Sequence, residues 1–196
     1  MTVKLGMFMM PFHPHDRDYG AVLAEDQEAI VLADRLGFTE AFVGEHFSSL
    51  SEPITSPLIF LATLAPRTER ITFGTGVLNL PQMHPAMVAG YAAMFDHLCR
   101  GRFIMGIGPG GLVSDFELFD VAQAELRPHM MLESIDAILE LAAWKTEGAG
   151  RRLIVTGCLP QRYGAELAKE LSTPTRAVGE FELKGVSAKQ SVFEPG

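Results

Sequence analysis

Three short polar or glycine-rich segments of this sequence each come directly after an apolar run. They are Glu45-His46, Asn79 and the glycine cluster Gly108–Gly111. Apolar runs that alternate with helical patterns are typical of buried parallel strands, whose carboxyl ends share one edge of the sheet. Side chains that bind ligands or do chemistry are usually found at that edge. We therefore expect the three segments to converge on a common mouth.

Two of these segments carry side chains with useful chemistry. Histidine exchanges a proton near neutral pH, so His46 is a candidate general acid or base. The alternative is a structural histidine that Glu45 or a loop carbonyl satisfies. The Asn79 carboxamide offers both a donor and an acceptor to the edge of a ring, although asparagine is also common in turns.

The glycines and one methionine are further candidates for contact with a ligand. Gly108, Gly110 and Gly111 let backbone N–H groups approach a bound group closely, and the same glycines would also suit an ordinary loop. Met9 belongs to a methionine-rich run near the start of the chain. It is either a core residue or part of the lining of a pocket.

Two other polar groups point to structure rather than chemistry. His13 and His15 lie in a proline-containing loop, and two histidines there do not supply a tetrahedral ligand set, so no metal is expected. Arg102 comes just before an apolar strand and therefore lies at the N-terminal face of the predicted barrel. Unusual residues at that face usually serve stability. A salt bridge to Asp96 is its expected role.

The composition argues against some classes of function. A formal net charge of −8 disfavours nucleic acids and anionic membranes as partners, because phosphate groups need Lys and Arg. Residues 71–95 carry no Asp, Glu, Lys or Arg over a length that could span a bilayer. A polar, proline-containing turn in the middle of this run opposes insertion. With no secretory signal and no spaced cysteine motif, the sequence predicts a cytoplasmic setting.

Alternating strand and helix patterns predict the fold class. Apolar strands begin near residues 4, 41, 71 and 103, and the helices predicted between and after them are Tyr19–Leu36, Pro57–Leu64, Pro85–Leu98 and Leu132–Trp144. This order gives a parallel sheet with helices outside, either an open doubly wound sheet or part of a (β/α)8 barrel. Because a full barrel takes about 250 residues, four βα units predict a partial TIM-like barrel with an irregular C-terminal tail.

Local signals set the helix boundaries and one buried face. Ser56-Pro57 is an N-cap followed by a first helical residue, Pro85 opens the third helix, and Gly37 ends the first. The third helix places several apolar side chains on one face, which periodicity predicts to be buried. They are Met87, Tyr91, Met94, Phe95 and Leu98.

The texture changes after residue 145, and we divide the chain into a half-barrel domain, 1–147, and a separate C-terminal segment, 148–196. Leu153–Val155 is a candidate strand and Ala165–Leu171 a candidate short helix. Val155–Gly164 resembles a fragment of a radical-SAM methylthiotransferase, and Gly179–Ser187 resembles the end of a nucleotide-cyclase domain. Both fragments are too short to carry either activity, since a cluster site needs several cysteines.

Five motifs in order carry a resemblance to a known family. They are Gly44-Glu45-His46, the segment Gly74–Pro81, His84-Pro85, the segment Asp96–Phe103 and the segment Gly106–Gly110. Together they resemble the bacterial luciferase-like flavin-dependent monooxygenases. The resemblance covers residues 3 to about 144, the N-terminal half of that family's (β/α)8 barrel.

The resemblance implies a cofactor and an activity. It implies reduced FMN supplied by a separate flavin reductase, or the deazaflavin F420 in one branch, bound at the carboxyl ends of the strands. It implies that His46 is catalytic and that Asn79, Met9 and the glycine cluster contact the cofactor. A second histidine of the family pattern is Phe47 here. The family also has a non-prolyl cis peptide near this site, for which Leu78-Asn79 is the candidate.

Two departures from the light-emitting luciferases bear on the site. Gly108 stands where they carry a reactive cysteine, and Pro109 stands where they carry an arginine for the flavin phosphate. The resemblance therefore implies oxygenation of a small organic substrate by molecular oxygen rather than light emission.

The predicted function is a flavin-dependent monooxygenase. The alternative is a non-catalytic flavin-binding or assembly half-barrel that lacks a complete active site. Because strands one and four of a half-barrel have open edges, we also expect a homodimer or a higher assembly that pairs them.

Overall fold

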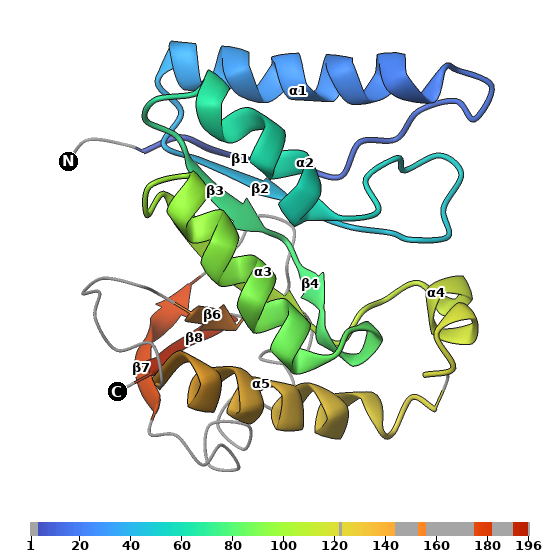
Figure 1. Ribbon diagram of the computed structural model, residues 1–196, viewed down its shortest axis with the longest axis vertical. Helices are drawn as coiled ribbons and strands as arrows, with labels where there is room; N and C mark the ends of the chain where they lie inside the picture. Colours follow the sequence, from blue (N-terminus) through green and yellow to red (C-terminus); the bar gives the residue numbers. More distant parts are fainter. Residues whose placement is uncertain (1–3, 122, 144–152, 156–174, 182–189, 196) are drawn as a thin grey trace.

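The computed structural model describes residues 4–121, 123–143, 153–155, 175–181 and 190–195 (Figure 1). The elements of the βα units are β1 (Gly6–Met9), α1 (Tyr19–Leu36), β2 (Glu40–Val43), α2 (Pro57–Leu64), β3 (Thr72–Thr75), β4 (Leu78–Asn79), α3 (Pro85–Leu98) and β5 (Phe103–Gly108). They are followed by α4 (Val113–Leu118), α5 (Arg127–Ala143), β6 (Leu153–Val155), β7 (Thr175–Phe181) and β8 (Gln190–Pro195). Two 3-10 turns, η1 (Ala65–Arg67) and η2 (Leu80–Gln82), follow α2 and β4.

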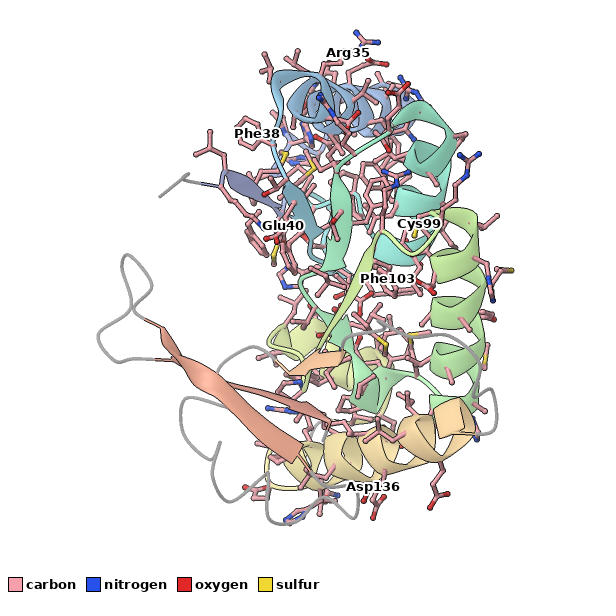
Figure 2. All side chains as sticks on the ribbon, turned by 90° about the vertical axis from the view of Figure 1, so that its left-hand side faces the viewer. Arg35, Phe38, Glu40, Cys99, Phe103 and Asp136 are labelled. Atoms are coloured by element: carbon pink, nitrogen blue, oxygen red, sulfur yellow. The ribbon has the colours of Figure 1, made fainter. Side chains whose placement is uncertain are left out.

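The parallel sheet has the order β1-β2-β3-β5, and β4 and β6 both pair with β5 further along the strand. Helices α1, α2 and α3 lie along one face of this sheet (Figures 1 and 2). The predicted partial barrel of four βα units is confirmed. The single strand predicted from residue 71 to 78 is two short strands, β3 and β4, separated by a cis peptide bond at Gly76-Val77. The predicted cis position, Leu78-Asn79, was wrong by two residues.

The boundaries of the helices follow from their caps. The Asp18 side chain accepts from the backbone N–H of Ala21 at 2.8 Å and starts α1, and Gly37 ends it in the left-handed conformation at φ 89°. Ser56 caps α2, and Pro85 is the first residue of α3. These ends agree with the prediction because the signals are local in the sequence.

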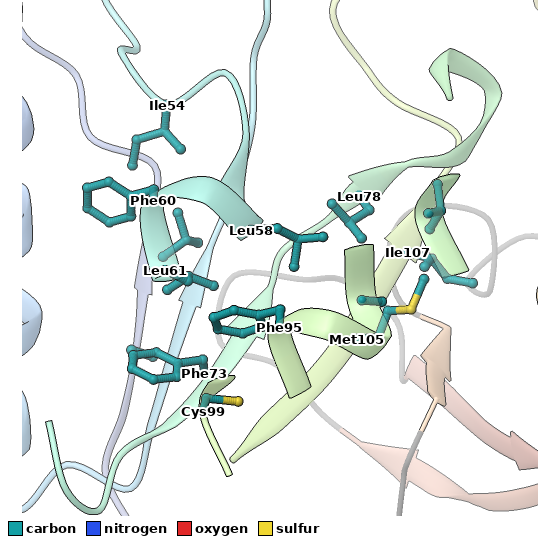
Figure 3. Packing of buried hydrophobic residues seen from close by; sticks show 14 of the residues in the cluster. Ile54, Leu58, Phe60, Leu61, Phe73, Leu78, Phe95, Cys99, Met105 and Ile107 are labelled. Carbon is teal, nitrogen blue, oxygen red and sulfur yellow. The ribbon is translucent and has the colours of Figure 1, made fainter. Parts of the chain in front are cut away.

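The buried face of α3 differs from the predicted one. Val88, Ala92 and Phe95 are buried, together with Cys99 beyond the helix end. The Phe95 ring packs against the Phe73 ring, with centroids 5.8 Å apart (Figure 3). It also packs against the Phe103 ring at 4.9 Å. Of the predicted face only Phe95 is inside, because the smaller Val88 and Ala92 let the helix pack closely on the sheet.

The other four side chains of the predicted face of α3 are exposed. The exposed fractions are 49% for Met87, 42% for Tyr91, 59% for Met94 and 54% for Leu98. They form a stripe that is turned by one residue, about 100°, from the buried one. Periodicity detects both stripes and cannot tell which of them meets the sheet.

The C-terminal tail contributes to the sheet. Leu153–Val155, the predicted strand, pairs in parallel with Met105–Ile107 of β5. The expectation that strand four has an open edge was therefore wrong, because β6 covers part of it, whereas β1 remains at the edge of the described sheet. The tail is also less irregular than predicted, since β7 and β8 form an antiparallel pair. The predicted helix Ala165–Leu171 lies outside the described residues.

Two charged side chains stabilise the end of the sheet where the strands begin. Asp34 is buried and accepts from the backbone N–H groups of Glu69, Arg70 and Ile71 at 2.7–3.1 Å. Burial alone would raise the pKa of this carboxyl, but the three bonds hold its pKa below the ordinary value. Asp34 thereby fixes the C-terminal end of α1 to the segment that enters β3.

Arg102 uses all five N–H groups of its guanidinium at the same end. Four bonds go to the carbonyl oxygens of Cys99, Ile71, Ala65 and Thr68, and one goes to the Thr68 hydroxyl, at 2.8–3.2 Å. The salt bridge to Asp96 stays a prediction, since the five bonds go to other groups. The structural role is confirmed, but it is exerted on the backbone.

Among the described helices, none combines the length and the apolar character that crossing a bilayer requires.

Substitution Arg102→Ala is expected to lower the free energy of unfolding by about 2–4 kcal/mol, because several carbonyl oxygens lose a charged donor. Arg102→Lys recovers only part of this loss, since an ammonium group cannot reach the same set of acceptors. Urea denaturation followed by circular dichroism measures both. The control is Arg35→Ala on the exposed side of α1, for which a change below about 0.5 kcal/mol is expected. Equal effects at both positions would contradict the assigned role.

Candidate active site

The three predicted segments lie at the carboxyl ends of neighbouring strands. Asn79, the last residue of β4, is paired in register with Gly108, the last residue of β5. The carboxylate of Glu45, two residues after β2, accepts from the backbone N–H of Asn79 at 2.8 Å. The ends of β2, β4 and β5 are thus joined directly, and the structure brings together the residues that the sequence singled out.

Glu45 is the most perturbed carboxyl group at this mouth. Burial is the largest cause and raises its pKa to about 7, and the nearby Asp115 carboxylate adds to the rise. The bond from Asn79 acts in the opposite direction and only partly offsets burial. A carboxyl group with such a pKa can hold its proton or release it near neutral pH. The sequence indicated the position of Glu45 but not this property, which depends on burial.

His46 points to a carboxylate that the sequence analysis did not single out. Its Nδ1 lies 2.6 Å from Oε2 of Glu52, and each side chain is 19% exposed. The partner is Glu52 rather than Glu45, which is engaged with Asn79. His46 therefore has one ring nitrogen bound to a carboxylate, while its Nε2 has no hydrogen-bond partner among the described residues.

Asp115 fixes the main chain next to His46. It is fully buried in α4 and accepts from the backbone N–H groups of Phe47 at 3.0 Å and Ser48 at 2.7 Å, and from the Ser48 hydroxyl. Burial would raise the pKa of Asp115, but the bonds from Ser48 and Phe47 hold it below the ordinary value. Phe47 also packs edge to face on Phe119, with centroids 5.0 Å apart. The loop after β2 is thus anchored to α4.

The first loop of the chain supports the same segment from the other side. The His13 backbone N–H donates to the Ser51 carbonyl at 2.7 Å, and the Tyr19 hydroxyl donates to the Pro53 carbonyl. The His13 ring contacts both carboxylate oxygens of Asp26 at 3.1 Å. The ring of His13 therefore has a structural partner in α1.

The glycine cluster forms a bend that side chains would disturb. Gly110 has φ 83°, and a Cβ atom there would lie 2.7 Å from the Phe116 ring. A Cβ atom on Gly108 would lie 2.7 Å from the Val77 side chain, whereas nothing lies within 4 Å of one on Gly111. Glycine is thus required at Gly110 by conformation and at Gly108 by close packing.

An unsatisfied donor lies beside this bend. Nε2 of Gln82, which ends the turn after β4, is the one buried side-chain nitrogen or oxygen without a hydrogen-bond partner in the described part of the chain. It lies 3.4 Å from the position of a Cβ atom on Gly110. A buried donor without a partner costs about 1–3 kcal/mol, so an acceptor from a ligand or water is expected here. The sequence gave no signal for Gln82.

Met9 occupies a different environment. It is partly buried, pairs in register with Val43 and packs against the hydrophobic core. Packing accounts for this residue, and its contact with a cofactor stays a prediction. Its neighbour Met10 is nearer to the mouth, because its sulfur would lie 2.8 Å from a Cβ atom on Gly44.

Comparison with known families identifies the chain. The profile of the luciferase-like monooxygenase family matches residues 3–163. The chain belongs to this family. The partial barrel agrees with this membership.

Two curated relatives and one solved structure agree with this membership. The chain is 42% identical over 139 residues to 4-hydroxyprotoasukamycin monooxygenase of Streptomyces nodosus subsp. asukaensis. The aligned residues make up 71% of this chain and 37% of the relative. It is 41% identical over 144 residues to limonene 1,2-monooxygenase of Rhodococcus erythropolis. This alignment covers 74% of this chain and 37% of that enzyme. One solved structure, in complex with FMN, is the oxygenating constituent of 3,6-diketocamphane monooxygenase of Pseudomonas putida. It superposes on this chain with a TM-score of 0.70 at 24% identity, and the match covers 80% of this chain and 42% of that one.

The luciferase-like chain spans little more than a third of the length of these curated relatives. A further relative has a different character. A ribosomal protein uS12 methylthiotransferase of Syntrophus aciditrophicus is 52% identical over 64 residues, which cover 33% of this chain and 14% of that protein. The resemblance of Val155–Gly164 to a methylthiotransferase stays a prediction, and its residues 156–164 lie outside the described part.

Substitution Glu45→Gln is expected to stabilise the protein increasingly as the pH rises. The folded state keeps the Glu45 proton up to about pH 7, whereas the unfolded chain releases it near the ordinary glutamate pKa of 4.5. Wild-type stability therefore falls relative to the variant between these values, by about 3–4 kcal/mol in total, and the difference is constant above them. Urea denaturation at intervals from pH 4.5 to 8.5 measures it.

The control for this experiment is Glu117→Gln, an exposed carboxyl on α4. A difference between wild type and Glu45→Gln that does not change with pH would show that Glu45 is ionised in the fold throughout.

Proposed function

We propose that this chain supplies the flavin-binding mouth of a luciferase-like monooxygenase that uses reduced FMN and molecular oxygen on a small organic substrate. The observation that carries the proposal is the convergence of Glu45-His46, Asn79 and the glycine bend at one end of the sheet. Relatives named for limonene and for diketocamphane oxidation support the reaction class, and one relative was solved with FMN.

The residues present fit a flavin. The unsatisfied N–H group of Gln82 and the side-chain-free bend at Gly110 suit a group rich in acceptors, such as a ribityl chain or a ring carbonyl. Pro109 has no backbone N–H to offer, so the cluster binds through its glycines. Asn79 and Met9 are proposed to contact the ring system, in keeping with the family resemblance.

Reduced FMN supplies the two electrons with which one oxygen atom enters the substrate and the other leaves as water. The chain's own residues handle protons and position. His46 accepts or donates a proton at Nε2, since its Nδ1 is bound to Glu52. Glu45 holds a second exchangeable proton at the same mouth, and the anchored loop after β2 keeps both groups in place. A separate flavin reductase is the proposed source of reduced FMN, in line with a relative named as an oxygenase component.

The second candidate function is a flavin-binding or assembly half-barrel without turnover. It is favoured by one observation, the length of the match, which covers 37% of the two curated monooxygenases. In barrel enzymes the phosphate site is usually built by the last βα loops. The titration below separates the two candidates.

A homodimer is proposed because large apolar side chains are exposed on α3. The stripe of α3 formed by Met87, Tyr91, Met94 and Leu98 is exposed, and Ile59 on α2, a helix that contacts α3, is 74% exposed. An exposed row of large apolar side chains on a helix is typical of a subunit contact. A second copy of the chain would pair such a stripe with its own equivalent.

Titration with oxidised and reduced FMN, followed by flavin fluorescence, tests the proposed function. Binding in the micromolar range is expected, with oxygen uptake when NADH and a flavin reductase are added. His46→Ala is expected to lower the rate of oxygen uptake about 100-fold or more while it leaves FMN affinity within a few fold. The control is His129→Ala on the exposed side of α5, which should leave both unchanged.

Binding of FMN without oxygen uptake would favour the half-barrel without turnover. If neither FMN nor F420 binds at concentrations up to millimolar, both candidate functions are contradicted. If F420 binds tightly and FMN does not, the deazaflavin replaces FMN as the proposed cofactor.

The double substitution Met87→Glu with Met94→Glu is expected to convert a dimer to a monomer, because it places charges in the middle of the apolar stripe. Light scattering coupled to size-exclusion chromatography measures the mass. Leu36→Glu, at an exposed position near the end of α1, is the control and should stay dimeric. A wild-type mass of one chain at 100 µM would overturn the proposed contact.

A further inference from the structure

The loop between β2 and α2 brings a glutamate back to the histidine at its start. Glu52 and His46 are six residues apart, and Oε2 of Glu52 lies 2.6 Å from Nδ1 of the imidazole. Both side chains are largely buried, each 19% exposed. Partial burial strengthens a hydrogen bond to a carboxylate, since less water competes for either partner.

We propose that Glu52 is the positioning residue of His46 and holds the imidazole as the tautomer protonated at Nδ1, with Nε2 free to accept a proton at the mouth. This inference rests on the proposed function for its catalytic consequence, but the tautomer itself does not depend on a flavin. A carboxylate can only accept a hydrogen bond, so the nitrogen that faces it must carry the hydrogen.

The path of the loop between β2 and α2 does not depend on the contact between Glu52 and His46. A positioning role of Glu52 can therefore be distinguished from a role in stabilising the loop. The backbone of this loop has four other attachments. The His46 N–H donates to the Ile54 carbonyl at 3.3 Å, the Ser51 carbonyl accepts from His13, the Pro53 carbonyl accepts from Tyr19, and Phe47 and Ser48 donate to Asp115. Glu52 can therefore be replaced while the path of the main chain is kept.

The other carboxyl groups near His46 are already engaged. Glu45 accepts from the backbone N–H of Asn79, and Asp115 accepts from Phe47 and Ser48. Neither is hydrogen-bonded to the His46 ring in the structure, although the charges of Asp115 and His46 do interact. Glu52 is thus the carboxylate that determines how the imidazole is oriented.

The proton balance of the step is simple. When Nε2 accepts a proton from a reacting group, the ring becomes an imidazolium that still donates its Nδ1–H to Glu52. The new positive charge then lies beside the carboxylate, which stabilises it, and no proton passes to Glu52. When Nε2 returns the proton, the original tautomer is restored.

Long-range ¹H–¹⁵N correlation spectra of ¹⁵N-histidine-labelled full-length protein test the tautomer directly, with His46→Ala used to assign the signals. At a pH where the ring is neutral, the wild type is expected to show the hydrogen at Nδ1. Glu52→Ala is expected to shift the population toward Nε2–H, whereas Glu52→Gln, which retains an acceptor oxygen, keeps most of the Nδ1–H form. Glu117→Ala is the control for loss of an exposed carboxylate near the mouth.

Wild-type His46 with its hydrogen at Nε2, or an unchanged tautomer in Glu52→Ala with an unchanged melting temperature, would overturn the proposal. The catalytic consequence is measured separately. Glu52→Ala is expected to lower kcat of FMN-dependent oxygen uptake at least about tenfold with little change in FMN affinity, and Glu52→Gln to restore part of it. If the wild type binds no flavin, the proposed function fails, and the tautomer measurement still decides the role of Glu52.

Discussion

The hydrogen bond from the Asn79 backbone to the partly buried Glu45 carboxyl is the contact on which the mouth depends. It joins the segment after β2 to the end of β4, which continues beyond β3 along β5. β3 stops at Thr75, and after a cis peptide at Gly76-Val77 the chain continues as β4 along β5. This shift moves Asn79 next to Gly108 and within reach of Glu45. Because the carboxyl is desolvated there, the same contact creates a group that exchanges its proton near neutral pH.

The two ends of the sheet have different tasks. Where the strands begin, Asp34 and Arg102 use nearly all their hydrogen-bonding capacity on backbone groups, and the cluster of Phe73, Phe95 and Phe103 fills the space between sheet and α3. Where the strands end, the partly buried Glu45 carboxyl has a raised pKa, and the Gln82 amide holds a buried donor without a partner in the described part of the chain. Stability resides at the first end, which lets the second tolerate groups suited to binding and proton transfer.

The sequence predicted those features that have local causes. The ends of α1 follow from Asp18 and Gly37, and Glu45-His46, Asn79 and the glycine cluster follow apolar strands directly, so their common edge was predictable. Features that depend on contacts between distant segments were missed. Helix α4 is six residues long and has no side-chain N-cap, so nothing marked Asp115 as the anchor of residues 47 and 48. Glu52 meets His46 only through the path of a loop, and the buried stripe of α3 could be chosen only with the sheet in place.

The central claim is that the ends of β2, β4 and β5 form one flavin-binding mouth, and chemical-shift mapping with FMN tests it most directly. The account predicts that backbone amide shifts on titration are concentrated in Glu45–Phe47, Val77–Asn79 and Gly108–Gly111. Shifts concentrated at the opposite end of the sheet, around Asp34 and Arg102, or along the outer surface of α1, would contradict it.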